Sequence, residues 1–92
     1  MGEWIVREVV VSHSQGIHAR PSHAIVATAS RFRSRVALTV GDRRADAKSI
    51  LSVMTLGAIQ GSRLKIETQG PDAREAAEAL VELVEKDFQE QR

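Results

Sequence analysis

The chain has 92 residues, 42% of them hydrophobic and 27% charged, which predicts one ordinary globular domain over residues 1–92 with a mostly aliphatic core, since aromatic residues make up 3%. The net charge of +1 gives no bulk attraction to nucleic acid or to membranes, and the lack of cysteine excludes disulfides, zinc–thiolate sites and thiol nucleophiles. No leader pattern and no apolar run of the ~18 residues that span a bilayer is present, so we expect a cytoplasmic protein without membrane insertion.

The first half of the chain predicts a strand, a helix and a hairpin. Residues 4–11, WIVREVVV, are mostly β-branched and apolar, which indicates a buried strand. Small and apolar side chains recur at helical spacing over residues 21–32, which predicts an amphipathic helix. Residues 36–40 alternate before the turn residues Gly41-Asp42, and the chain returns through residues 43–47, which is typical of a β-hairpin.

The second half predicts two further helices around one strand. Ser49 opens a short apolar stretch that suits one or two helical turns ending before Gly57. Residues 63–68, RLKIET, alternate between apolar and polar, as a half-buried strand does. Asp72, with Glu75 three residues later, forms a capping-box pattern that opens the final helix. One apolar face of that helix is traced by Ala73, Ala76, Ala77, Leu80, Leu83, Val84 and Phe88.

The element order is therefore β-α-β-β-α-β-α. Because each apolar face needs one partner layer, this order predicts the α+β class and a two-layer open-faced sandwich. We expect a four-stranded antiparallel sheet with three helices packed on one face.

The stretch QGIHARP places a histidine where a turn becomes a helix. Gly16 suits a sharp bend, and Pro21 suits the first helical turn, where its missing N–H costs little. His18 then falls at the helix mouth, where free N–H groups and the helix dipole attract phosphate and favour the neutral, nucleophilic imidazole. Arg20 adds a fork of donors suited to phosphate oxygens. These residues predict a histidine that accepts a phosphoryl group, with a merely solvated histidine as the alternative.

Two motifs, GIHARP followed by a small-residue helix and later KSILSVMTLG, resemble a known family. They are similar to the histidine-containing phosphocarrier protein HPr of the bacterial phosphoenolpyruvate:sugar phosphotransferase system, over nearly the whole chain. The resemblance implies that Nδ1 of His18 receives a phosphoryl group from enzyme I and passes it to enzyme IIA domains of sugar transporters, assisted by Arg20. It implies a monomeric phosphoryl carrier that is phosphorylated stoichiometrically, and not an enzyme.

Ser49 is a candidate regulatory site as well as a helix cap. In the family that the chain resembles, the serine of the KSI motif is phosphorylated by an ATP-dependent kinase in some lineages. This implies two further partners, an HPr kinase/phosphorylase and a catabolite-control regulator. A phosphate would add roughly −1.5 to −2 charges at a helix N-terminus, so we expect inhibition by repulsion of acidic partners and not by refolding.

The short helix after Ser49 is also the candidate partner interface. The resemblance places Ile50, Leu51 and Met54 on its exposed side, next to the phosphorylated histidine, as an apolar patch for enzyme I and enzyme IIA. Flexible Met and Leu side chains suit a surface that serves several partners. We expect Val53 and Leu56 to face the core instead.

Other functions compete with the carrier interpretation. His13, His18 and His23 recur every five residues, a spacing that does not gather ligands on a helix, so we expect no metal and no cofactor. A small hydrolase would use Arg20 to bind and His18 as a base, and would turn over a substrate alone. A purely regulatory paralogue would act by protein binding when Ser49 is phosphorylated. His23 stands where family members usually have a small or apolar residue, so a nitrogen-linked regulatory branch also stays open.

Overall fold

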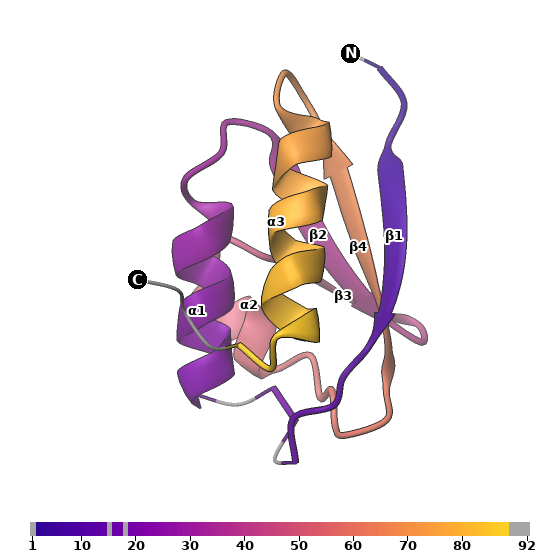
Figure 1. Cartoon of the computed structure of the whole chain (residues 1–92), viewed down its shortest axis with the longest axis vertical. Coiled ribbons are helices and arrows are strands. Elements are labelled where there is room, and N and C mark those ends of the chain that lie inside the picture. Colours follow the sequence, from indigo (N-terminus) through magenta and orange to yellow (C-terminus); the bar gives the residue numbers. More distant parts are fainter. Residues whose placement is uncertain (1, 15, 18, 89–92) are drawn as a thin grey trace.

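The computed structural model describes residues 2–14, 16–17 and 19–88. Strands and helices follow one another in the predicted order, and Figure 1 shows α1, α2 and α3 on one face of the sheet. This confirms the two-layer α+β sandwich. None of the helices in this part of the chain has the length and apolar character needed to cross a bilayer. The elements are β1 (Ile5–Val10), α1 (Ala19–Ala29), β2 (Arg35–Val40), β3 (Arg43–Asp46), α2 (Ile50–Met54), β4 (Arg63–Gln69) and α3 (Ala73–Glu85).

The strands form one four-stranded antiparallel sheet in the order β1-β4-β2-β3. In the central strand β4, Ile66 lies opposite Arg7 of β1 and opposite Leu38 of β2. Side chains alternate between the two faces of a sheet, so Leu64, Ile66 and Leu38 all point toward the helices. The aliphatic core is centred on these three side chains together with Ile25 of α1 and Leu80 of α3.

Strand β1 is an edge strand and not the buried strand that its composition predicted. Val9 is buried, but Val6 and Val10 on the other face are 49% and 57% exposed. Helices cover one face of the sheet, so the alternate residues of β1 face solvent. A run of β-branched residues indicates a strand without showing how many of its faces are covered.

Helix α1 begins and ends earlier than the predicted range 21–32. It starts at Ala19, which makes Pro21 the third residue, still in the first turn where the missing N–H has no helical acceptor. It ends at Ala29, after which the N–H of Arg31 donates to the carbonyl of Thr28 and the N–H of Phe32 to that of Ala29. These three-residue spacings form a tighter turn, which carries the half-buried Phe32 against the core.

Helix α3 begins after Asp72 as predicted, but the capping-box prediction is wrong. The Asp72 carboxylate makes no bond to its own helix. It accepts hydrogen bonds from the backbone N–H groups of Arg33 and Ser34, at 3.0 and 2.9 Å, and from the Ser34 hydroxyl. The Ser34 hydroxyl bond, followed by the Arg33 N–H, lowers the pKa of Asp72 from 3.8 to about 2. Asp72 therefore joins the start of α3 to the loop between α1 and β2.

The end of α3 also differs from the prediction. The helix stops at Glu85, and Asp87 and Phe88 adopt left-handed conformations with φ of 59° and 65°. The N–H of Phe88 donates to the carbonyl of Leu83 at 2.7 Å. Phe88 is buried as expected, but it reaches the core from this turn and not from a face of the helix.

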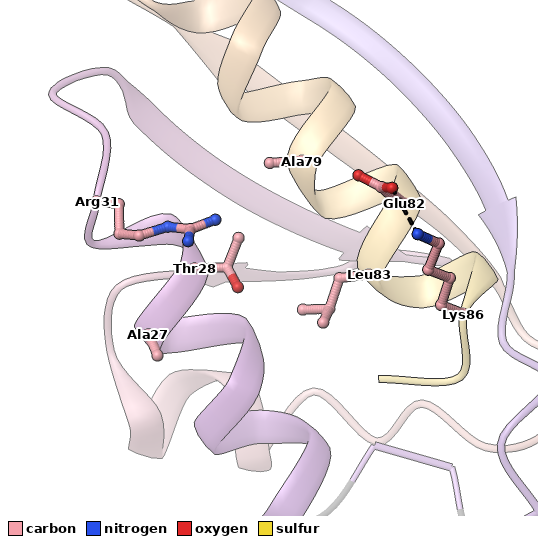
Figure 2. A pocket seen from close by; sticks show the side chains of 7 residues that line it. All are labelled: Ala27, Thr28, Arg31, Ala79, Glu82, Leu83 and Lys86. Atoms are coloured by element: carbon pink, nitrogen blue, oxygen red, sulfur yellow. Dashed lines mark hydrogen bonds and ion pairs between the residues drawn. The ribbon is translucent and has the colours of Figure 1, made fainter. Parts of the chain in front are cut away.

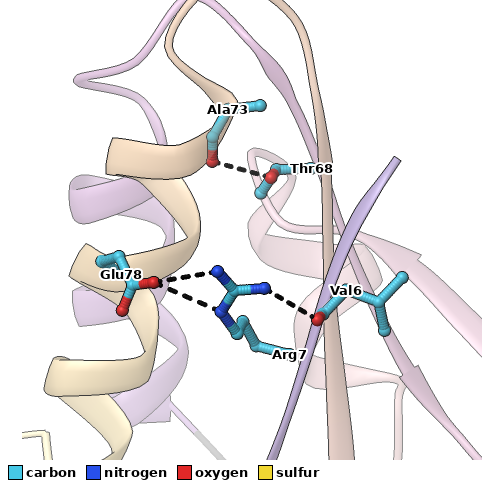
Figure 3. A network of polar contacts seen from close by, with 5 residues as sticks. All are labelled: Val6, Arg7, Thr68, Ala73 and Glu78. Atoms are coloured by element: carbon cyan, nitrogen blue, oxygen red, sulfur yellow. Dashed lines mark hydrogen bonds and ion pairs between the residues drawn. The ribbon is translucent and has the colours of Figure 1, made fainter. Parts of the chain in front are cut away.

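Two polar contacts tie α3 to the sheet (Figure 3). Arg7 of β1 donates through Nε and Nη2 to one carboxylate oxygen of Glu78, at 3.2 and 3.1 Å. Thr68 of β4 is fully buried, and its hydroxyl donates to the carbonyl of Ala73 at 2.7 Å. A buried hydroxyl needs such a partner, and this one fixes the first turn of α3 against β4.

Candidate functional site

The loop that enters α1 is anchored on the residue before the candidate histidine. Gly16 is buried at φ +68°, where a Cβ atom would lie 2.5 Å from the carbonyl oxygen of Ala58 and 2.8 Å from Cα of Ile59. Ile17 is 5% exposed, and its N–H donates to the carbonyl of Ala58 at 3.1 Å. His18 itself lies outside the described residues. Its two neighbours in the chain are the anchored Ile17 and the first residue of α1.

Arg20 lies in the first turn of α1 and is exposed. Across the described residues its guanidinium has neither a hydrogen-bond nor an ion-pair partner. The first turn of α1 contains no acidic side chain that would offset the positive end of the helix dipole. The helix mouth and Arg20 together can therefore hold an anion such as a phosphoryl group.

Ser49 caps α2 as predicted. It has extended backbone angles, its hydroxyl accepts from the N–H of Ser52 at 3.3 Å, and its carbonyl accepts from the N–H of Val53. Asp46 holds the preceding turn, because its carboxylate accepts from the N–H of Lys48 and its carbonyl from that of Ser49. The Ser49 side chain is half-buried at the N-terminus of α2. Its phosphorylation remains a prediction.

Helix α2 divides its apolar side chains between the core and the surface as expected. Val53 and Leu56 are 0% and 2% exposed, whereas Ile50, Leu51 and Met54 are 38%, 72% and 44% exposed. We call these last three residues the apolar patch. Exposed apolar side chains that cluster on one short helix are typical of a binding surface. The partner contacts of the apolar patch remain a prediction.

Ile59 was not predicted from the sequence as a surface residue, and it is 67% exposed. It follows Ala58 in the loop after α2, the same loop that packs on Gly16 and Ile17. The hydroxyl of Ser62 accepts from the N–H of Ile59 at 2.9 Å and holds this loop in place. An apolar residue in a glycine-bounded loop was the available signal, but the sequence does not show on which side of the loop it lies.

Two basic side chains near the end of α1 point elsewhere than to the helix mouth. Lys48 donates through Nζ to the carbonyl of Phe32 at 2.7 Å. Arg31 has its guanidinium carbon 5.9 Å from the Phe32 ring centroid.

Arg31 also lines a groove of about 420 Å³ between α1 and α3. Figure 2 shows this groove, with Glu82 and Lys86 joined across one turn of α3 at 2.7 Å. The bond to Lys86 lowers the pKa of Glu82.

The other two histidines have separate surroundings. His13 lies in the loop after β1, with its ring edge-on to Phe88 at a centroid distance of 5.9 Å. His23 is exposed on α1. Among the residues that the structure describes, which exclude His18, no group of three or more His, Cys, Asp or Glu side chains could hold a metal ion.

Known proteins resemble this chain over most of its length. Residues 5–86 match the family model described as the PTS HPr component phosphorylation site. The phosphocarrier protein HPr of Xylella fastidiosa is 40% identical over 83 residues, which cover 90% of this chain and 93% of that protein. The HPr-like protein Crh of Halalkalibacterium halodurans is 35% identical, over 90% of this chain and 99% of that protein. The crystal structure of HPr-C-His from Thermoanaerobacter tengcongensis matches with a TM-score of 0.89 at 36% identity, covering 96% of this chain and 99% of that one. The chain therefore belongs to the HPr family of phosphocarrier proteins.

Proposed function

We propose that this protein accepts a phosphoryl group from phospho-enzyme I on His18 and donates it to enzyme IIA domains of sugar transporters. It acts in the cytoplasm as a monomer, as a stoichiometric carrier and not as an enzyme that turns over a substrate. The observation that carries the proposal is the anchored loop. Gly16 and Ile17 fix the chain immediately before His18, at the start of a helix whose first turn carries no acidic side chain and where Arg20 is exposed.

The anchored loop suits phosphoryl transfer for a physical reason. The imidazole lone pair attacks phosphorus as the bond to the donor breaks, and the three phosphoryl oxygens need donors at that moment. Backbone N–H groups of the first turn of α1, which have no acceptor within the helix, and the guanidinium of Arg20 would supply them. A carrier must release the group again, so an exposed site that holds phosphate by few contacts serves better than a deep one.

The apolar patch and Ile59 form the proposed docking surface for enzyme I and enzyme IIA. Ile59 stands on the loop that anchors Ile17, so it lies along the same edge of the molecule as the helix mouth. Burial of exposed apolar side chains gives most docking surfaces their affinity. One small surface used in turn by donor and acceptor partners fits a shuttle.

Ser49 offers a second function that the structure also favours, namely regulation by phosphorylation. Its hydroxyl already sits at the N-terminus of α2, where a phosphate is favoured by the helix dipole, directly before Ile50 of the apolar patch. Modification by an HPr kinase/phosphorylase would place negative charge beside the docking surface and create a form that a catabolite-control regulator can bind. A purely regulatory paralogue would bind its partner when Ser49 is phosphorylated and carry no phosphoryl group on His18, whereas a nitrogen-branch paralogue would differ from a sugar-linked carrier in its partners.

The test incubates the protein with phosphoenolpyruvate and enzyme I and maps acid-labile phosphate by mass spectrometry. We expect one phosphoryl group per chain on His18, none in His18→Ala, and full labelling in the matched control His23→Ala, since His23 is exposed on the same helix. Full labelling of His18→Ala would overturn the assignment. Acid-stable phosphate on Ser49 from an ATP-dependent kinase, with no labelling by enzyme I, would favour the regulatory function instead.

A further inference from the structure

A second hollow, of about 550 Å³, lies where β2 begins and β3 ends. Leu38 pairs with Ala45 and both face the core, so the neighbouring pair of Ala37 and Asp46 lies on the face of the sheet that carries no helix. None of the lining residues belongs to α2 or to the loop before α1. The lining combines one aromatic ring, four basic side chains and one carboxylate, from Trp4, Arg33, Arg35, Arg44, Lys48 and Asp46.

Trp4 reaches this hollow from the opposite edge of the sheet. It precedes β1, yet the guanidinium carbon of Arg44 on β3 lies 5.3 Å from its ring centroid. Arg44 also forms an ion pair with Glu67 of β4, and Gln69 donates to the carbonyl of Gly2 at 2.9 Å. These contacts hold the indole across the strands. Trp4 is 38% exposed, so part of its surface faces the hollow and the solvent.

Positive charge in the hollow is largely uncompensated. Within the described ranges, the guanidinium groups of Arg33 and Arg35 have no hydrogen-bond or ion-pair partner. Lys48 directs its ammonium to the carbonyl of Phe32, which leaves its charge in place. The carboxylate of Asp46 is the single acid of the lining. Two unpaired guanidinium groups present forks of donors that match phosphate oxygens.

We propose that this hollow binds a nucleoside phosphate, with the base against Trp4 and the phosphate on Arg33 and Arg35. A planar base is the group that stacks on an indole or on the plane of a guanidinium such as Arg44. The hollow has the size of small-molecule sites, which are about 300–1,000 Å³. A sugar phosphate has no planar aromatic group to stack on the indole, and a free base would leave the guanidinium groups unused. The site is separate from the phosphoryl relay and does not depend on it.

The test is a titration of the full chain with ADP, followed by two-dimensional ¹H–¹⁵N NMR. The chain has one tryptophan, so the indole N–H of Trp4 gives a single resonance that reports on the hollow. We expect saturable shifts of this resonance and of the Ala37 amide. Ribose 5-phosphate and adenosine, which carry the phosphate without the base and the base without the phosphate, should each bind about tenfold or more weakly than ADP, since each lacks one class of contact.

One variant tests the phosphate contacts, and a second variant is its control. The double variant Arg33→Gln, Arg35→Gln should weaken ADP binding by about tenfold, because it removes both charge-assisted phosphate contacts. Arg63→Gln on β4 should leave binding unchanged, since Arg63 is exposed and does not line the hollow. The proposal is overturned if ADP gives no shifts, if ribose 5-phosphate binds as tightly as ADP, if both variants weaken binding equally, or if the shifts centre on α1.

Discussion

Replacing Gly16 by alanine tests whether main-chain packing positions the loop that leads into His18. Gly16 has φ +68°, and an added Cβ would lie 2.5 Å from the carbonyl oxygen of Ala58, whereas ordinary contact begins at 3.4 Å. Both neighbouring atoms belong to the backbone, so no side chain can turn away. The loop must move, and the bond from the N–H of Ile17 to the same carbonyl must lengthen or break.

The magnitude follows from three contributions. Left-handed backbone costs a residue with a Cβ roughly 1–2 kcal/mol, part of which is offset because alanine lowers the entropy of the unfolded chain. Overpacking adds about 1–3 kcal/mol, and loss of the Ile17 hydrogen bond about 1 kcal/mol. Gly41→Ala has the first contribution alone, because Gly41 has φ +61° and no atom within 4 Å of the added Cβ. The two variants should therefore differ by about 2–4 kcal/mol in the free energy of unfolding.

Urea unfolding followed by circular dichroism measures this difference. For a domain of this size, about 2 kcal/mol corresponds to a separation of roughly 8–16 °C in Tm. The amide of Ile17 should also exchange its hydrogen faster in Gly16→Ala than in Gly41→Ala. Equal unfolding free energies for the two variants, within about 0.5 kcal/mol, would refute the argument that the close approach to Ala58 holds this loop.

Three further predictions concern the polar links and the docking surface. The pKa of Asp72 is lowered from 3.8 to about 2, so its ionised carboxylate stabilises the folded state fully at pH values above 3.8. This stabilisation is lost as the pH falls toward about 2. An acid titration by circular dichroism should therefore show Asp72→Asn less stable than the parent at neutral pH, with the gap closing over that interval; a gap independent of pH would contradict the link to Ser34. Thr68→Val should cost about 1 kcal/mol in urea unfolding through loss of the bond to Ala73, and no change would show that this bond is not needed. Leu51→Asp should leave Tm within about 3 °C, since Leu51 is 72% exposed, yet slow transfer from phospho-enzyme I; normal transfer rates would contradict its docking role.

Hydrophobic patterns, together with cap and turn residues, predicted the order of the elements, because most of the helices and strands are covered on one side and their apolar residues recur at the matching spacing. Residues 63–68 show this well, since Leu64 and Ile66 are buried as their alternation predicted. Element ends were harder to predict. The turn at Phe32 and the role of Asp72 depend on contacts with residues distant in sequence. Asp72, for example, binds Ser34, which lies 38 positions earlier in the chain. No local pattern encodes which backbone group a carboxylate will find after folding.

The candidate site also has features that the sequence predicted and features that it could not predict. The N-cap role of Ser49 is local and was predicted from the residue type and its position before a short helix. The exposure of Leu51 was implied by the resemblance to the phosphocarrier family, and the burial of Val53 was expected beside it. The exposure of Ile59 and its place beside the loop that leads into His18 could not be predicted, because they result from packing between Gly16 and Ala58, 42 positions apart.

A phosphoryl shuttle has to keep its reactive group exposed and still hold it in one position. In this chain the backbone meets the second demand: Gly16 packs on a carbonyl, and Ile17 enters the core and donates to that same carbonyl. The side chains that would meet partners, Leu51 and Ile59 among them, make no contribution to these anchoring bonds. Substitutions on the proposed docking surface are therefore expected to change which partner binds without moving the loop that leads into His18. Separating the anchor from the contact surface lets one small fold keep its chemistry while its partners change.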